Sequence, residues 1–562
     1  MRREVSVVNK KVCSFPILFA LLALVIGTCA VVFPASAQAA PTSIGSITVS
    51  GTVASSYDAY QIFSANVVDG DNDAKIATDL AWASDAARDA VLPVLHSAGM
   101  PKSQTTAQEA AEWLNTDSHL TSALSAQLAR SLQSPGAVSK ALNAGTAAEL
   151  PSGYWLIVAD DDAIAQGEAG TAPIMALVGG SAVTVKPKAA TPKVAKHVLE
   201  DSTAAWQKAA DATVGDNLYW RLSATVPAGL TAYDTYAVQF VDTMSAGLDP
   251  SKVAASMHVY VAAGADGTFD AVSAGKDGRA GTEPAKGWTD ITAQRVTKVA
   301  ADGTFTVRTG DLIAALGGAD AFAAGARVVA VYNAPLNSAC NHGIAKGNPN
   351  EVYLRYPRSP FADQSGDAGF THTPSDDACA YTWDLALTKR GSDGDKPLAG
   401  AVLSIADDRG RTLAADGMWD AEGKATVTTG EDGRVTVSGV DSGKLEVREL
   451  KAPKGYAAFE GTRSVTVKAE GLDVDQVAAA KPKLTITAES PLRADSADGS
   501  TGSLEASLIN TPTGTPPSIT TGGFMPSTGD MAIYAAAAAA VAGAALIVVA
   551  LLVKRGGGSH KE

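Results

Sequence analysis

The chain is poor in cysteine and in basic residues. Only four cysteines occur among 562 residues, and Cys13 and Cys29 lie in an apolar amino-terminal segment. The remaining pair, Cys340 and Cys379, leaves room for one disulfide, with two free thiols as the alternative. Lysine and arginine number 45 against 59 aspartates and glutamates, which gives a net charge of −14. This acidic balance argues against a nucleic-acid partner.

A calcium loop is also not expected. The acidic run Asp69-Gly70-Asp71-Asn72-Asp73 has calcium-loop character, but no glutamate follows at the spacing that such a loop needs. We therefore predict a solvated turn there. The sequence predicts no metal site and no cofactor.

Long apolar runs occur at the two ends of the chain. Basic residues precede an apolar segment from Phe15 to Phe33, and small-x-small cleavage sites follow it. Residues 1–39 are therefore predicted to be a secretory signal peptide, with a first-helix membrane anchor as the alternative.

The second apolar run, from Met531 to Val553, is long enough to cross a bilayer as a helix, and basic residues follow it. Just before it stand Met525, Pro526, Ser527, Thr528 and Gly529. Residues 525–562 thus resemble the cell-wall sorting signal of Gram-positive surface proteins, although Met525 replaces the usual leucine. The resemblance implies that a sortase cleaves between Thr528 and Gly529. A plain tail anchor is the alternative.

Breaks in composition predict a mainly β protein with three domains. The first combines strands, such as the one through Ile47 and Val49, with helices over 79–92 and 107–132. The other two are strand-rich, with a linker over 359–377, and a Pro/Thr/Gly-rich stalk precedes the sorting signal. The predicted boundaries are 41–188, 189–378, 379–512 and, for the stalk, 513–524.

Three strands of the third domain carry a polar residue at the end of an otherwise apolar face, because residues of the same parity share one face. The three faces are Leu385, Leu387 and Lys389; Leu445, Val447 and Glu449; and Leu504, Ala506, Leu508 and Asn510. Burial favours the neutral amine of Lys389 and the neutral acid of Glu449. These are the requirements for an amide bond between Lys389 and Asn510 with loss of ammonia.

Residues 449–456 (ELKAPKGY) match the E-box pattern, E-x-x-A-P-x-G-Y, of CnaB-type immunoglobulin-like domains in Gram-positive pilins. The resemblance implies tandem CnaA/CnaB-type β-sandwiches and an isopeptide bond between Lys389 and Asn510, with Glu449 as the catalytic acid. The alternative is an ordinary hairpin turn with Glu449 on the surface.

The middle domain resembles that of three-domain pilin backbones in segments such as 242–248 (DTMSAGL). Parity places Lys196 and Asp242 on apolar faces, as a candidate amine and acid. Where the family has its acceptor asparagine the chain has Arg358, which cannot accept the lysine. Asn350 lies on the same face and is the candidate substitute, and a Cys340–Cys379 disulfide is the other candidate cross-link.

The first domain ends in 183–188 (VTVKPK), which resembles the pilin motif V-x-V-Y-P-K. The resemblance implies that Lys188 attacks the sortase-bound threonine of the next subunit. Lys186 or Lys193 could take its place, and a plain lysine-rich linker is the alternative.

The chain is therefore identified as resembling the major, shaft-forming pilins of Gram-positive bacteria, which are structural proteins and not enzymes. This implies a wall-anchored extracellular pilus in which a class C sortase joins Thr528 to Lys188. Implied partners are that sortase, a housekeeping sortase with its peptidoglycan precursor, further copies of the chain and minor pilins. A monomeric wall-anchored adhesin and a minor basal or tip pilin remain alternatives.

Overall fold

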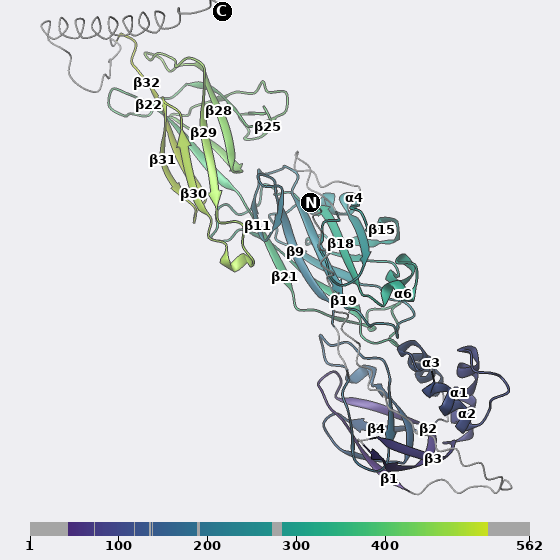
Figure 1. Cartoon of the computed structure of the whole chain (residues 1–562). Helices are drawn as coiled ribbons and strands as arrows, with labels where there is room; N and C mark the ends of the chain where they lie inside the picture. Colours follow the sequence, from purple (N-terminus) through teal and green to yellow (C-terminus); the bar gives the residue numbers. More distant parts are fainter. Residues whose placement is uncertain are drawn as a thin grey trace, which may run out of the picture.

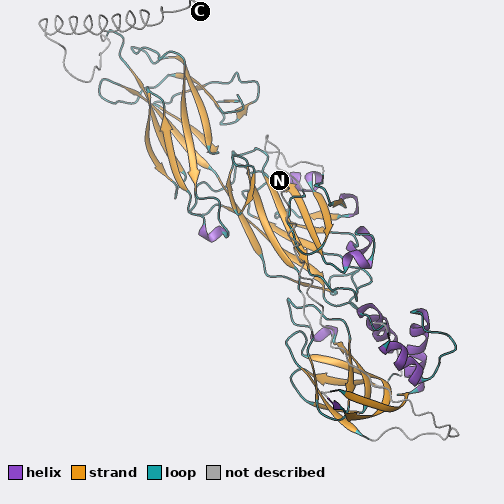
Figure 2. Ribbon diagram, viewed as in Figure 1, coloured by secondary structure: helices purple, strands orange, loops and turns teal. Residues whose placement is uncertain are grey.

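Strands are the main secondary structure, as the alternation of apolar and polar residues predicts. The computed structural model describes residues 43–71, 74–116, 119–133, 137, 139–187, 191–271 and 284–514. Three units follow one another along an elongated molecule, with the first and third at opposite ends (Figure 1). The described helices gather mainly in the first unit (Figure 2). The expected mainly β fold with a partly helical first domain is confirmed.

The first unit contains two sheets and three helices. One sheet has the order β5-β1-β8, and the other has the order β3-β2-β6-β7 with β4 beside β2. The strands are β1 Ile44–Val49, β2 Ser56–Asp69, β3 Lys75–Trp82, β4 Ser139–Asn143, β5 Ala148–Pro151, β6 Gly153–Ala159, β7 Ile174–Val178 and β8 Val183–Val185. The helices are α1 Asp85–Ser97, α2 Ala107–Asn115 and α3 Ser122–Leu132.

The helices of this unit start at side-chain caps, and their boundaries differ from the predicted ones. The helix predicted over 79–92 begins only at Asp85, because β3 continues to Trp82 and the Ser84 side chain accepts a hydrogen bond from Ala87 N. The helix predicted over 107–132 is two helices. The second begins after Thr121, whose side chain caps it by accepting from Leu124 N.

The middle unit packs two sheets face to face. The first has the order β10-β9-β12-β18-β14-β15, and the second has the order β11-β21-β19-β13-β17-β16 with β20 beside β19. The strands are β9 Lys193–Glu200, β10 Ala205–Gln207, β11 Ala209–Asp211, β12 Tyr219–Val226, β13 Gln239–Met244, β14 His258–Ala263, β15 Thr289–Asp290, β16 Val296–Val299, β17 Thr304–Arg308, β18 Ala326–Asn333, β19 Asn348–Pro357, β20 Phe370–His372 and β21 Asp376–Tyr381. Short helices are α4 Val253–Ser256, α5 Leu312–Ala315 and α6 Ala319–Phe322.

The predicted linker over 359–377 contains ordered strand. β20 and the start of β21 fall within it, and both pair with β19. β21 also crosses the predicted boundary at 378, so the middle unit extends to Tyr381 and the third begins with β22.

The third unit is a sandwich of two sheets, with orders β27-β22-β32-β31 and β25-β24-β23-β28-β29-β30, and β26 beside β23. The strands are β22 Trp383–Gly391, β23 Val402–Ala406, β24 Thr412–Leu413, β25 Trp419–Asp420, β26 Val427–Thr428, β27 Arg434–Val440, β28 Gly443–Lys451, β29 Thr462–Glu470, β30 Lys483–Ala488, β31 Leu492–Asp498 and β32 Ser503–Asn510. The first and last strands, β22 and β32, are parallel neighbours.

Among the described residues no helix is long and apolar enough to cross a membrane. The signal peptide, Lys188, most of the stalk and the whole sorting signal lie outside these residues.

Candidate functional site: two buried amine, acid and amide clusters

The third unit brings its three predicted site residues together. Lys389 on β22 and Asn510 on β32 belong to one sheet, whereas Glu449 on β28 reaches them from the facing sheet. All three are buried, with exposed fractions of 0%, 2% and 6% respectively. Their apolar strand neighbours Leu387 and Leu508 are buried too, so the predicted parity of these faces is confirmed.

The carboxylate of Glu449 lies between the amine and the amide. Its Oε1 is 3.3 Å from Lys389 Nζ, and Asn510 Nδ2 donates to its two oxygens at 2.9 and 3.0 Å. Phe459 N donates to the same carboxylate at 3.1 Å. Asn510 Oδ1 is buried without a hydrogen-bond partner in the described structure, an arrangement that usually marks a strained or functional group.

Burial changes the protonation of the lysine. It lowers the pKa of Lys389 from 10.5 to about 8, and the nearby Glu449 charge offsets this only in part. A larger fraction of the amine is therefore neutral and nucleophilic near neutral pH than for an exposed lysine.

A second cluster of the same chemistry occupies the core of the middle unit. Lys196 on β9 comes from one sheet, and Asp242 on β13 and Asn350 on β19 come from the other. All three are fully buried. Lys196 forms an ion pair with Asp242. Burial lowers the pKa of Lys196 to about 8 and raises that of Asp242 to about 6, which favours the neutral forms of both.

Tyr332 on β18 joins this cluster, and the sequence analysis missed it. Its hydroxyl accepts from Lys196 Nζ and from Asn350 Nδ2, each at 2.9 Å, and donates to Asp242 Oδ2 at 3.1 Å. The signal was present in the sequence, because Tyr332 shares strand parity with the buried Val328 and Ala330. Asn350 is thus placed with the amine and the acid.

Arg358, at the family's acceptor position, lies elsewhere. It is at the junction with the first unit, where its carbonyl accepts from Gly170 N at 2.6 Å and its guanidinium donates to Asp161 O at 3.3 Å. Tyr356, two residues earlier, donates to Gly167 O at 2.7 Å. These residues hold the first and middle units together.

The predicted Cys340–Cys379 disulfide is not formed, and both thiols are free. Cys379 is buried on β21, where its Sγ contacts the Ala380 carbonyl at 3.7 Å. Cys340 lies in the loop after Asn337, whose carbonyl accepts from Cys340 N at 3.1 Å. A disulfide needs two Cβ atoms that face each other within a narrow distance, and proximity in the fold alone does not provide this.

The end of the first unit agrees with the predicted inward valines. Val183 and Val185 pack in the core beside β1, Lys186 is exposed, and Pro187 follows. Lys193, the other stand-in for Lys188, is exposed at the start of β9.

Asp69, from the acidic run, binds Lys75 Nζ at 3.1 Å and Ser181 N. No metal-binding cluster occurs among the described residues.

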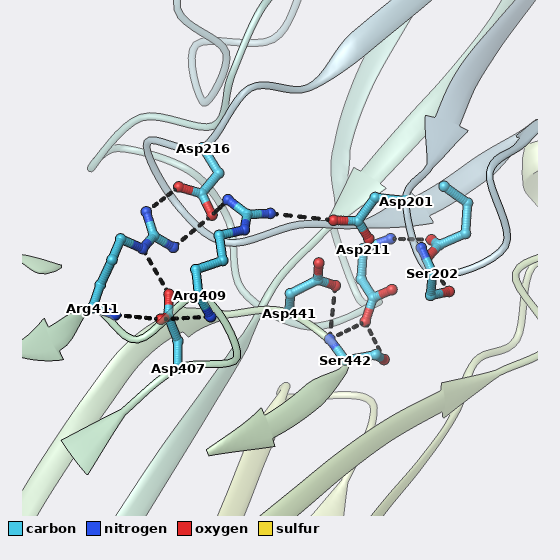
Figure 3. Close-up of polar contacts among 10 residues, drawn as sticks. Asp201, Ser202, Asp211, Asp216, Asp407, Arg409, Arg411, Asp441 and Ser442 are labelled. Atoms are coloured by element: carbon cyan, nitrogen blue, oxygen red, sulfur yellow. Dashed lines mark hydrogen bonds and ion pairs between the residues drawn. The ribbon is translucent and has the colours of Figure 1, made fainter. Parts of the chain in front are cut away.

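Polar contacts join the middle and third units (Figure 3). Asp216 pairs with Arg409 at 2.7 Å and with Arg411 at 2.5 Å. Asp211 accepts from Trp383 Nε1 at 2.6 Å and from Ser442 N at 2.9 Å. This joint also gathers the carboxyl groups of Asp201, Asp211 and Asp441 (Figure 3). The carboxylate of Glu200 lies beside them and accepts from Asp211 N at 3.1 Å.

The third unit is therefore a β-sandwich with a lysine, a carboxylate and an asparagine in its core. Residues 384–481 match the model of the SpaA family, a prealbumin-like fold domain, so this part of the chain is similar to a SpaA-type domain. A curated relative, the trypsin-resistant surface T6 protein of Streptococcus pyogenes serotype M6, is 30% identical over 143 residues. That match spans 24% of this chain and 24% of the relative's length.

Solved structures of pilins match over much of the chain. The T6 backbone pilin of serotype M6 Streptococcus pyogenes has a TM-score of 0.44 and 17% identity, and the match covers 85% of this chain and 100% of that one. The major pilin SpaD of Corynebacterium diphtheriae has a TM-score of 0.41 and 15% identity over the same shares. The proteins in this comparison are pilus subunits and not enzymes.

Proposed function

We propose that this chain is the shaft subunit of a covalent pilus on a Gram-positive cell surface. The observation that carries the proposal is the buried contact of Glu449 with both Lys389 and Asn510, between the first and last strands of a SpaA-type domain. Burying an amine, an acid and an amide in an apolar core costs more free energy than burying apolar side chains, so the cluster calls for a functional reason. The trypsin resistance in the T6 relative's name is a property that internal cross-links would produce.

The third unit forms an isopeptide bond in this proposal. Lys389 transfers a proton to Glu449, and the neutral Nζ then attacks Cγ of Asn510. The Nζ–Cγ bond forms, the Cγ–Nδ2 bond breaks, and the leaving nitrogen takes a proton and departs as ammonia. Glu449 contacts both nitrogens, so it can move protons between them. The reaction occurs once per molecule and needs no cofactor.

The middle unit forms a second isopeptide bond, between Lys196 and Asn350, with Asp242 as the acid. The sequence left this bond in doubt because Arg358 occupies the family's acceptor position. The support comes from burial and contact: Lys196 Nζ and Asn350 Nδ2 each lie 2.9 Å from one phenol oxygen.

Polymerisation in this proposal uses Lys188, after the first unit, and Thr528 of the sorting signal. A class C sortase cleaves after Thr528 and joins its carbonyl to Lys188 of the next subunit, and a housekeeping sortase transfers the finished polymer to the peptidoglycan precursor. Further copies of the chain and minor pilins are the protein partners, and the pilus supports adhesion and colonisation. The sequences around Lys188 and Thr528 support these steps.

An immunoblot of wall extracts boiled in SDS tests the proposal. A shaft subunit gives a ladder of covalent multimers, and Thr528→Ala abolishes both the ladder and wall anchoring because no acyl-enzyme forms. A single anchored band in the wild type would instead identify a monomeric wall adhesin. A band restricted to polymers of another pilin would identify a minor basal or tip subunit.

A further inference from the structure

The two buried clusters differ in how the acid reaches the amide. In the third unit Glu449 accepts directly from Asn510 Nδ2. In the middle unit the acid is aspartate, which is one methylene shorter. Within the described structure Asp242 Oδ1 has no hydrogen-bond partner, and Asn350 Nδ2 donates to the hydroxyl of Tyr332 at 2.9 Å.

The hydroxyl of Tyr332 lies between the acid, the amine and the amide, and it uses its full hydrogen-bonding capacity there. A phenol offers one donor and two acceptor positions. It accepts from the attacking nitrogen, Lys196 Nζ, and from the leaving nitrogen, Asn350 Nδ2, and it donates to Asp242. It is therefore the group in the described structure that contacts all three partners of the reaction.

The protein also holds this phenol in place. Tyr332 is fully buried, and its ring packs edge-on against Phe305 with centroids 4.9 Å apart. A hydroxyl buried in the core cannot replace these partners with water. Losing any of the three hydrogen bonds would therefore leave a buried polar group unpaired, which costs free energy.

We propose that Tyr332 is a catalytic residue of the middle unit, which carries the proton that the shorter acid cannot deliver to the leaving amide. Lys196 first gives one proton to Asp242. As Nζ bonds to Cγ of Asn350, the phenol passes its proton to Nδ2 and takes one from Nζ. The Cγ–Nδ2 bond breaks, Nδ2 leaves as ammonia with the phenol's proton, the proton from Nζ regenerates the phenol, and Asp242 keeps the proton that it took first.

This inference rests on the proposed isopeptide bond in the middle unit, and one experiment separates the two. The mature ectodomain is expressed as wild type and as Tyr332→Phe, and intact mass is followed after induction, with peptide mapping of both cross-links. Tyr332→Phe retains the ring and its packing. The expected result is wild type with both bonds, and a variant in which the Lys196–Asn350 bond forms about 100-fold more slowly. The Lys389–Asn510 bond of the same molecule is the internal control.

Two further variants identify the cause. Tyr233→Phe removes another buried phenol of the same core, whose hydroxyl has no hydrogen-bond partner among the described residues, and it should leave both bonds intact. Adding Asp242→Glu to Tyr332→Phe lengthens the acid and should restore part of the lost rate. Wild type without a middle bond would overturn the proposed cross-link. Wild type with both bonds and Tyr332→Phe with an unchanged rate would overturn the role of Tyr332.

Discussion

Lys389 and Asn510 lie at the ends of the first and last strands of the third unit, and these strands are parallel neighbours in one sheet. A pilus shaft under tension would pull on the start of β22 and the end of β32, in opposite directions. A covalent bond between the two side chains would carry that force in place of the backbone hydrogen bonds. The proposed bond would therefore join the same two strands on which tension in a shaft would act.

Glu449→Ala should leave the third unit folded but without its bond. The variant should keep the ammonia that the wild type loses, a difference of about 17 Da. Closing a loop of about 120 residues removes roughly 4 to 5 kcal/mol of unfolded-state entropy, by analogy with disulfides. We therefore expect a lower melting temperature and faster trypsin cleavage, measured by calorimetry and gel. A variant with the wild-type mass and protease resistance would contradict the role of Glu449.

The wild-type ectodomain should lose two molecules of ammonia, about 34 Da in all. The sequence leaves the middle bond open, and the contact of Asn350 with Tyr332 supports a second lost ammonia. Lys196→Ala and Lys389→Ala should each restore one ammonia, and the double variant should restore both. Intact-mass spectrometry measures this directly. A deficit of one ammonia that Lys196→Ala leaves unchanged would eliminate the middle bond.

Lys188→Ala should collapse the SDS-resistant ladder to monomer while wall anchoring persists, because the sorting signal is intact. Lys186→Ala and Lys193→Ala serve as matched controls, since both lysines are exposed near the same exit from the first unit. An immunoblot of wall extracts provides the measurement. If the ladder survived Lys188→Ala but disappeared in one of the controls, that control position would be the nucleophile.

The joint between the middle and third units should weaken as pH rises. Burial and the neighbouring Asp211 raise the pKa of Glu200 from 4.5 to about 7. The folded state then holds the proton more tightly than the unfolded state, so this stabilisation is complete below pH 4.5 and is lost as pH rises to 7. Glu200→Gln should raise the melting temperature at pH 8 by a few degrees and have little effect at pH 4.5. An equal effect at both pH values would show that Glu200 is not the titrating group.

Much of the third-unit site could be predicted from the sequence, because strand parity is a local property. Apolar residues at a spacing of two precede each of Lys389, Glu449 and Asn510. The burial of these three side chains could therefore be predicted without a structure. The helix ends were harder to predict from the sequence. The start of α1 at Asp85 depends on how far β3 extends before Ser84 caps the helix. The predicted linker was wrong in part because β20 has only three residues, and it becomes a strand only by pairing with β19.

The sequence by itself determined which side chains face the core, because alternation along one strand needs no partner. Only the tertiary structure decided which of these buried groups meet. Asn350, and not Arg358, lies with Lys196 and Asp242 because of the register of β19 against β13. Tyr332 contacts Lys196 within its own sheet and Asp242 and Asn350 on the facing sheet, and Cys340 and Cys379 are free thiols. Such contacts depend on how two sheets stack and on the direction of each Cβ, and no pattern within a single strand contains that information.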